Sequence, residues 1–244
     1  MEQLRDLPEE VREQLSTFVE AARVAWGQEL VSVILFGSAA EGRLRATSDV
    51  NLLLVLRRFV QEDVDKIREP FRIARATIRL GAMFVLENEL ERAAAAFAVK
   101  FDDILSRHRI LYGANVLARI EVSRPAAVAR LRQVLLNLRL RLRERYALVS
   151  LREEQLAEVI ADSTGPLRAC AAMLLRLEGQ AVESPKEALR RLVAEWQDAT
   201  LEDALQQMSV AREQGAIAPG AAPAVAFRMM ALAERLQERV DRLT

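Results

Sequence analysis

Apolar and polar positions divide the chain into a first part that mixes strand and helix periods and a second part with helix periods alone. Runs rich in β-branched and other apolar residues predict strands at residues 31–36, 50–56 and 77–86. Apolar residues three and four positions apart predict helices at residues 8–26, 61–74 and 89–105. The first part is therefore predicted to have an α+β fold.

Every period after about residue 118 is helical. Proline and glycine start or stop helices, and their positions predict helices at residues 125–161, 165–179, 185–199, 201–214 and 223–243. We therefore predict two domains, residues 1–118 and 119–244. The second domain is predicted to be an all-α, antiparallel helical bundle.

The most informative motif joins the first two predicted strands. The first strand ends at Gly37 and Ser38, and Asp49 lies eleven residues after that serine. Glycine allows a tight turn close to a ligand, and Ser38 is a candidate N-cap of a short helix whose free N–H groups favour an anion. Period-two alternation places Asp49 and Asn51 on one face of the second strand. Such a pair of oxygen ligands suits Mg²⁺, although a strand, a turn and a capping serine equally explain the dipeptides alone.

Residues 37–54 resemble the signature GSxARGxxxxxSDxDLLV of the minimal, kanamycin-type nucleotidyltransferases, which belong to the DNA polymerase β-like superfamily. The matching residues are Gly37, Ser38, Ala40, Gly42, Ser48, Asp49, Leu52 and Leu53. A wider resemblance covers about residues 11–113, where FDDILSRHRILYG is similar to the helix and closing turn that end this domain.

The resemblance implies the nucleotidyltransferase fold, a small mixed sheet flanked by helices. It also implies transfer of a nucleoside monophosphate from a nucleoside triphosphate to a hydroxyl, assisted by two Mg²⁺ ions. Gly37, Ser38 and Gly42 would then bind phosphate, and Asp49 would bind metal.

Three departures from the signature bear on that activity. Asn51 stands at the second metal-binding aspartate and brings no negative charge. Glu41 replaces an arginine, and it would repel a triphosphate by ~1 kcal/mol at a solvated separation of about 4 Å. Family members carry a third carboxylate on a later strand, whereas the predicted strand at residues 77–86 contains no acid.

We therefore predict a nucleotidyltransferase-fold protein with a degenerate two-metal site, which binds a nucleotide weakly or acts as a regulatory or interaction protein. Weak or absent Mg²⁺ binding is expected. The alternative is an active, divergent nucleotidyltransferase that transfers a nucleoside monophosphate to a small molecule or a protein. It needs a missing carboxylate from Glu87, Asp63 or Asp65, which are expected on solvated turns or helix faces, or from the bundle or a second subunit.

The helical part resembles the substrate-binding half of such enzymes or a relative of the HEPN ribonucleases. That ribonuclease activity uses an arginine and a histidine close together in the helical domain. The only histidine, His108, precedes this domain at a predicted helix end, so ribonuclease activity is not expected. Glu153 and Glu154 are candidates for a base toward a hydroxyl substrate, with a solvated helix face as the alternative.

The formal net charge of zero argues against nonspecific nucleic-acid binding. The cations are nearly all arginine, and we interpret the three lysines, Lys66, Lys100 and Lys186, as composition bias rather than a phosphate-binding design. A run of arginines at residues 130–145 is interpreted as solvated helix surface, with a nucleotide cleft or an acidic partner as the alternative.

Neither a membrane span nor a signal peptide is predicted, because charges interrupt the apolar runs and the N-terminus is polar. A cytoplasmic location is therefore expected. Cys170 is the only cysteine and lies on an apolar face, so we interpret it as a core residue. The expected partners are a nucleoside triphosphate and, through the helical bundle, a second copy or another protein.

Overall fold

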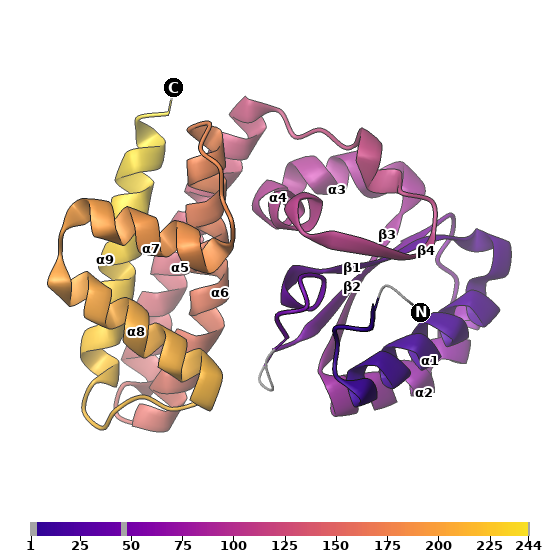
Figure 1. Ribbon diagram of the computed structural model, residues 1–244, viewed down its shortest axis with the longest axis horizontal. Coiled ribbons are helices and arrows are strands. Elements are labelled where there is room, and N and C mark those ends of the chain that lie inside the picture. The colour runs from indigo at the N-terminus through magenta and orange to yellow at the C-terminus, as the bar shows by residue number, and fades with distance from the viewer. Residues whose placement is uncertain (1–3, 45–47, 244) are drawn as a thin grey trace. The chain divides into compact units, whose positions relative to one another are not determined.

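The computed structural model describes residues 4–44 and 48–243, and it divides the chain into two compact units, residues 1–122 and 123–244 (Figure 1). The polar link that the sequence predicts between Gly42 and Ser48 falls partly on residues 45–47, outside the described residues. Among the described residues, no helix is both long and apolar enough to cross a membrane.

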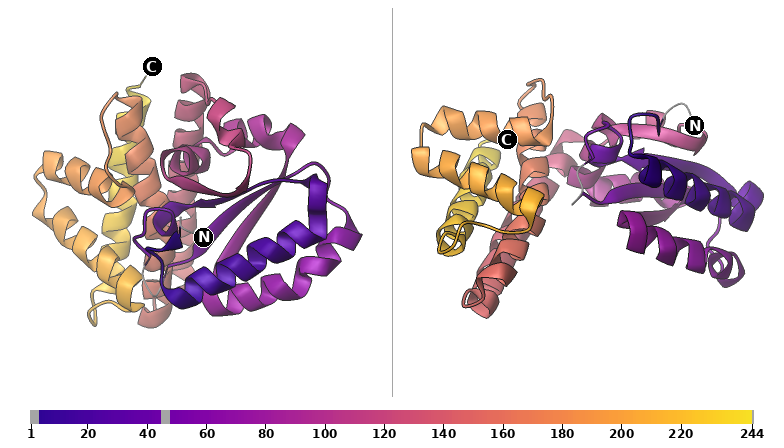
Figure 2. Two further views of the ribbon diagram at one scale, coloured as in Figure 1. Left: turned by 45° about the vertical axis from the view of Figure 1, so that its right-hand side comes forward. Right: turned by 60° about the horizontal axis from the view of Figure 1, so that its bottom comes forward.

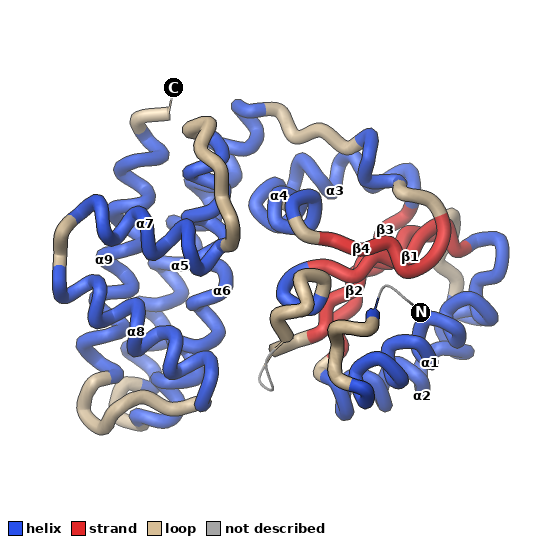
Figure 3. Tube along the Cα trace, in the orientation of Figure 1, coloured by secondary structure: helices blue, strands red, loops and turns tan. Residues whose placement is uncertain are grey.

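A four-stranded mixed sheet forms the first unit, with the strand order β3-β2-β1-β4 (Figure 3). The strands are β1 (Leu30–Phe36), β2 (Val50–Leu56), β3 (Leu80–Leu86) and β4 (His108–Gly113). β1 is antiparallel to both β2 and β4, whereas β2 and β3 are parallel. This topology confirms the predicted α+β class and the small mixed sheet.

Helices cover both faces of the sheet (Figure 2). One face packs against α1 (Glu9–Trp26) and α2 (Gln61–Ile78), and the other against α3 (Leu90–Ala96) and α4 (Ala98–Ser106). Alternate residues of β2 enter the two cores, with Leu52 and Leu54 on the α1 and α2 side and Leu53 and Val55 on the other. Each fully buried side chain of this kind contributes about 2 kcal/mol of transfer free energy. The predicted period-two alternation is thus confirmed.

β4 is a strand that the sequence pattern does not reveal. A helix and a closing turn are expected in this segment, and the prediction of the turn is wrong. Residues 108–113 instead form a strand that pairs with β1, with His108 opposite Phe36 and Tyr112 opposite Val33. The strand lies at an edge of the sheet and is half-buried with charged residues, so it lacks the alternation of a strand with one buried face.

Two further boundaries in the first unit differ from the prediction. α2 continues through Pro70 to Ile78, which is buried in the core, so β3 begins at Leu80 rather than at residue 77. The helix expected at residues 89–105 is interrupted at Phe97, whose φ of −118° and ψ of 43° separate α3 from α4.

The second unit is all-helical. Its helices are α5 (Arg124–Val149), α6 (Glu153–Leu177), α7 (Pro185–Trp196), α8 (Ala199–Gln214) and α9 (Ala222–Asp241). α6 contacts each of the other four helices and is the central element of the unit (Figure 1).

The predicted break near Gly165 is wrong, because α6 runs through Gly165 and Pro166. A Cβ on Gly165 would lie 3.1 Å from Nη1 of Arg212 on α8, so the glycine gives this side chain room. The long predicted helix is instead divided at residues 150–152.

Part of the arginine run of α5 pairs with α9, since Arg132 bonds Asp241 at 2.8 Å and Arg139 pairs with Glu234. Cys170 is fully buried, as a core residue should be, and burial raises the pKa of its thiol to about 12.

Candidate functional site

Four chain segments meet at one end of the sheet. β1 finishes where β2, β3 and β4 begin, because Phe36 pairs with Asn51 and with His108, and Val50 pairs with Leu80. We call this region the site end. It comprises residues 36–42, 49–51, 79–80 and 107–108 together with the side chain of Lys100. The candidate site residues Gly37, Ser38, Gly42, Asp49 and Asn51 all belong to it.

The turn after β1 is a three-residue 3₁₀ helix, Gly37–Ala39. Gly37 has a φ of 79°, which favours glycine, and its N–H donates to the carbonyl of Arg107 at 3.2 Å. The expectation that Ser38 is a helix N-cap is wrong, because no side chain caps this short helix. A helix dipole therefore contributes little here, and any role of Ser38 toward phosphate rests on its hydroxyl and on the family resemblance.

Gly42 packs against the N-terminal segment. Its φ is 69°, and a Cβ would lie only 2.2 Å from Oδ2 of Asp6. Asp6 accepts two hydrogen bonds from Arg109 of β4, at 2.7 and 2.5 Å, and these bonds lower the pKa of the Asp6 carboxyl. This close contact explains the glycine without any ligand, so phosphate binding by Gly42 stays a prediction.

Asp49 already has a cationic partner from the protein. Nε of Arg79 donates to Oδ1 of Asp49 at 2.9 Å, and both side chains are more than half exposed. The neighbouring Asn51 donates from Nδ2 to the carbonyl of Asp49 at 3.3 Å. Gly81 of β3 lies opposite Asn51, and a Cβ there would come within 3.1 Å of Oδ1 of Asn51. Carboxylate and amide thus adjoin as predicted, and the carboxylate is paired with a guanidinium.

Sequence reasoning missed Arg79. It ends α2 in a left-handed conformation, with φ 51°, and it directly precedes the first residue of β3. The partner lies 30 residues away along the chain. Only the parallel register of β2 and β3 brings Arg79 close to Asp49. The sequence could have indicated this contact only through the start of β3, which was predicted three residues too early.

Glu41 is not an uncompensated negative charge. It pairs with Nη1 of Arg107 at 3.1 Å, and each of these side chains is 19% exposed. Arg107 also bonds both oxygens of Asp103 on α4, at 2.6 and 2.8 Å. Desolvation alone would lower the pKa of Arg107, but its bonds to Asp103 and Glu41 outweigh that effect and raise the pKa. The expected repulsion of a triphosphate by Glu41 is therefore largely cancelled.

Lys100 of α4 is a second cation, which the sequence analysis named but did not place at the site. Its ammonium lies over the ring of Phe36, 5.6 Å from the ring centroid. Phe36 is the direct cross-strand partner of Asn51, so the two side chains share a face of the sheet. Desolvation lowers the pKa of Lys100, and the charge of Asp103 partly opposes this shift. Lys100 therefore lies at the site end, and the interpretation of the lysines as composition bias stays a prediction.

The alternative carboxylates lie at the opposite end of the strands. Glu87 follows β3 and pairs with Arg57 and Arg119, at 3.8 and 3.7 Å. Because β3 is seven residues long, Glu87 and Asp49 are separated by roughly 20 Å.

Asp63 and Asp65 lie in the first turns of α2, which begins beyond the same far end of β2. Asp65 pairs with Arg68, and Asp63 bonds Lys66 at 2.9 Å. Asp63 is only 5% exposed, so the expectation of a solvated position is wrong for it.

The donor set at the site end does not fit two metal ions. Among residues 4–44 and 48–243, no three histidine, cysteine, aspartate or glutamate side chains are grouped to hold a metal. The reaction implied by the resemblance needs negatively charged ligands for both ions. One carboxylate that is paired with Arg79, beside a neutral amide, does not supply them.

His108 begins β4, two residues after α4 ends, and its Nδ1 is 3.0 Å from the carbonyl of Ile104, in the last turn of α4. Glu153 and Glu154 form the first turn of α6 in the second unit. Glu154 is exposed, as the solvated-face interpretation expects, and Glu153 is half-buried.

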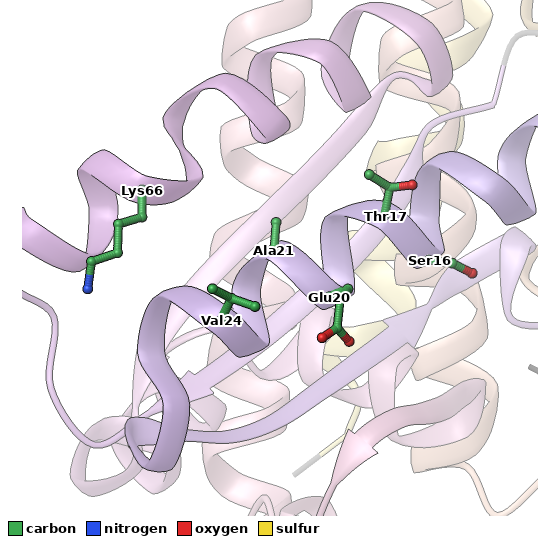
Figure 4. Close-up of a pocket in the computed structure, with 6 residues that line it drawn as sticks. All are labelled: Ser16, Thr17, Glu20, Ala21, Val24 and Lys66. Atoms are coloured by element: carbon green, nitrogen blue, oxygen red, sulfur yellow. The ribbon is translucent and has the colours of Figure 1, made fainter.

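A pocket of about 560 Å³ lies between the outer surfaces of α1 and α2 (Figure 4). Its lining residues are Ser16, Thr17, Glu20, Ala21, Val24 and Lys66. It shares no residue with the site end. Its lining includes two charged side chains, Glu20 and Lys66, which pair with Arg23 and Asp63 respectively.

Residues 15–123 match a family model described as a nucleotidyltransferase domain. The crystal structure of spectinomycin adenyltransferase AAD(9) from Enterococcus faecialis, solved with ATP and spectinomycin, is similar to this chain with a TM-score of 0.67. The similarity covers 94% of this chain and 99% of that chain at 12% sequence identity, so it concerns the fold alone. A search of curated proteins finds no match. Residues 15–123 are thus identified as a nucleotidyltransferase domain, and the structural similarity agrees with that fold.

Proposed function

We propose that the nucleotidyltransferase domain binds a nucleotide weakly at the site end without efficient transfer, and that the protein acts as a nucleotide sensor or an interaction module. The observation that carries this proposal is the state of Asp49, whose carboxylate pairs with Arg79 at 2.9 Å. In the described part of the chain, no group of three or more histidine, cysteine, aspartate or glutamate side chains is placed to hold a metal. Two-metal catalysis depends on carboxylates that place both ions between the attacking and leaving oxygens.

The same geometry supports retention of nucleotide binding. The N–H of Gly37 donates to the carbonyl of Arg107, the residue directly before β4, and this bond holds the backbone of the turn in place. The cations Lys100 and Arg79 lie on either side of the Asn51 position. In this proposal Gly37, Ser38 and Gly42 face the phosphates, Asp49 is the remaining metal ligand of the family, and Asn51 is the substituted position.

A second candidate function is favoured by the extent of the structural similarity. The adenyltransferase solved with ATP and spectinomycin is similar to nearly the whole of this chain, including its helical unit. An active, divergent nucleotidyltransferase would transfer a nucleoside monophosphate to a hydroxyl of a small molecule or a protein. It would need charge for the metal ions from a carboxylate outside the site end.

A protein partner or a second copy is proposed to bind the helical unit. α5 exposes Leu136, Leu140 and Leu148, each by about half or more of its surface. Exposed apolar residues on one helix are typical of protein interfaces when they are adjacent. Light scattering after size-exclusion chromatography tests this: a mass of 27.4 kDa at all concentrations would contradict a homodimer.

Calorimetric titration with ATP, GTP, CTP and UTP, with and without Mg²⁺, tests the main proposal. We expect weak binding of at least one nucleotide and little gain from Mg²⁺. The same titration of Asn51→Asp, which restores the second carboxylate of the signature, is expected to increase the Mg²⁺-dependent affinity. Asn88→Asp is the matched control, because Asn88 is exposed in the turn after β3, at the opposite end of the strands.

Two results would contradict the proposal. Micromolar binding and turnover that both require Mg²⁺ in the unaltered protein would support the active enzyme instead. Absence of binding by every nucleotide, in the unaltered protein and in Asn51→Asp, would leave only an interaction role.

A further inference from the structure

At Asp49 the protein supplies a cation of its own. Arg79 donates to Oδ1 of Asp49 from Nε, and within the described residues its two Nη groups donate to no other residue. A guanidinium presents five N–H donors in a planar fork that matches phosphate geometry. Two of its three nitrogens are therefore available to a phosphate while the third holds Asp49.

The backbone fixes Arg79 in this position. Its φ of 51° is one of two positive values for residues other than glycine among the described residues. Its N–H donates to the carbonyl of Ala74, and the next residue, Leu80, is buried and pairs with Val50. A left-handed non-glycine residue costs about 1–2 kcal/mol, so the surrounding contacts must stabilise this conformation. The position of Arg79 beside Asp49 is thus set by the sheet register.

Lys100 brings a second cation to the same end. Among the described residues it forms no ion pair, and it reaches the site end through its contact with the ring of Phe36. Desolvation lowers its pKa, although the residue as a whole is exposed to solvent. An anion bound next to Phe36 and Asn51 would oppose that shift, because it favours the charged ammonium.

We infer that Arg79 and Lys100 supply the positive charge that metal ions supply in two-metal nucleotidyltransferases, so that the site end binds a free nucleoside polyphosphate without a divalent cation. This inference rests on the proposed function, because it concerns the same site. Arg79 neutralises the Asp49 carboxylate, which would otherwise repel the phosphates, and it offers them its Nη groups. Lys100 offers its ammonium from the other side of Asn51.

The inference predicts in which direction Mg²⁺ changes the affinity for ATP. Free ATP carries more negative charge than its Mg²⁺ complex and presents more unpaired phosphate oxygens to the two cations. Mg²⁺ should therefore weaken binding, whereas a two-metal enzyme needs Mg²⁺ for productive binding. Binding should also weaken as salt rises, because both side chains are in contact with solvent.

Calorimetric titration of the full chain with ATP tests the inference, once in EDTA and once in excess Mg²⁺. We expect tighter binding in EDTA. Arg79→Gln and Lys100→Gln should each weaken binding in EDTA by about tenfold, as expected for loss of one charge-assisted hydrogen bond. The matched controls are Arg72→Gln, an exposed arginine of α2 paired with Glu69, and Lys186→Gln in the second unit. Neither control should change the affinity.

The outcomes separate the inference from the proposed function. ATP binding that requires Mg²⁺, or that both Arg79→Gln and Lys100→Gln leave unchanged, would overturn the inference and leave nucleotide binding intact. Failure of every nucleotide to bind in either buffer would overturn the proposed function itself. Circular dichroism of each variant shows whether the fold is retained, and Arg79→Lys, which keeps the charge and loses the fork, should bind with intermediate affinity.

Discussion

Arg107→Met tests the ion pairs that support the turn at Gly37. The substitution removes the guanidinium that lies between Glu41 and Asp103 and keeps a long apolar side chain in its place. Two acids, 19% and 17% exposed, then lose their shared partner. The main-chain bond from the Gly37 N–H to the carbonyl of residue 107 remains, so the change reports mainly on the charges.

The expected loss follows from the separation and the burial. Two unit charges 3.1 Å apart, as for Glu41 and Arg107, interact by about 5 kcal/mol at an effective dielectric constant of 20 and by about 1 kcal/mol in bulk water. Removing one partner of a fully buried pair costs about 3–5 kcal/mol, because the other charge is left uncompensated. Since water reaches about a fifth of each side chain here, we expect a loss of about 2 kcal/mol.

Urea unfolding measures this loss in the first unit. The chain has two tryptophans, Trp26 in the core of the first unit and Trp196 in the second. In a Trp196→Phe background, fluorescence therefore reports on Trp26 alone. A loss of 2 kcal/mol should lower the urea midpoint by about 1.5 M at an m-value near 1.3 kcal/mol/M.

Arg92→Met is the control for this experiment, because Arg92 is exposed on α3 and forms no ion pair among the described residues. The variant Glu41→Gln, Asp103→Asn, Arg107→Met, which removes all three charges, should recover most of the lost stability. Equal midpoints for Arg107→Met and Arg92→Met would refute the role given to the Arg107 ion pairs.

Three further predictions concern other parts of the chain. Cys170 should not react with a disulfide reagent at pH 8, because it is buried and its pKa is about 12, and it should react fully after unfolding in urea. Gly42→Ala should lower the unfolding free energy by about 1–2 kcal/mol more than Gly27→Ala. Both glycines have a positive φ, but of the two only Gly42 has a neighbour, Asp6, within 3 Å of the added carbon. Hydrogen bonds from Arg109 lower the pKa of Asp6 from 3.8. This pair therefore stabilises the fold above pH 3.8 and loses its effect as the pH falls through the lowered pKa of the folded protein. The urea midpoints of the unaltered protein and of Asp6→Asn should then converge at acid pH.

Local sequence patterns were sufficient for the parts of the fold that bury apolar residues. β2 was predicted with its observed bounds, because its alternate residues enter two separate cores. The turn at Gly37 and the position of Asp49 and Asn51 followed from the family signature. These features depend on residues that are close together in the chain.

The missed features depend on contacts between distant residues. β4 is a charged edge strand that is defined by its pairing with β1. Gly165 lies inside α6, where an added Cβ would come within 3.1 Å of Arg212 on α8. The partners of Asp49 and Glu41 lie 30 and 66 residues away. Sequence reasoning therefore found the carboxylates of the site end, and the cations that neutralise them emerged only from the sheet register and the packing of α4.

The transfer of labelled AMP from ATP that carries its label on the α-phosphate, measured together with the release of pyrophosphate, tests the central claim most directly. The reaction would contain Mg²⁺ and a saturating concentration of ATP, with spectinomycin as one acceptor and the protein itself as another. The account predicts no transfer of labelled AMP and no pyrophosphate release above that of Asp49→Ala. Mg²⁺-dependent release by the unaltered protein that Asp49→Ala abolishes would contradict it.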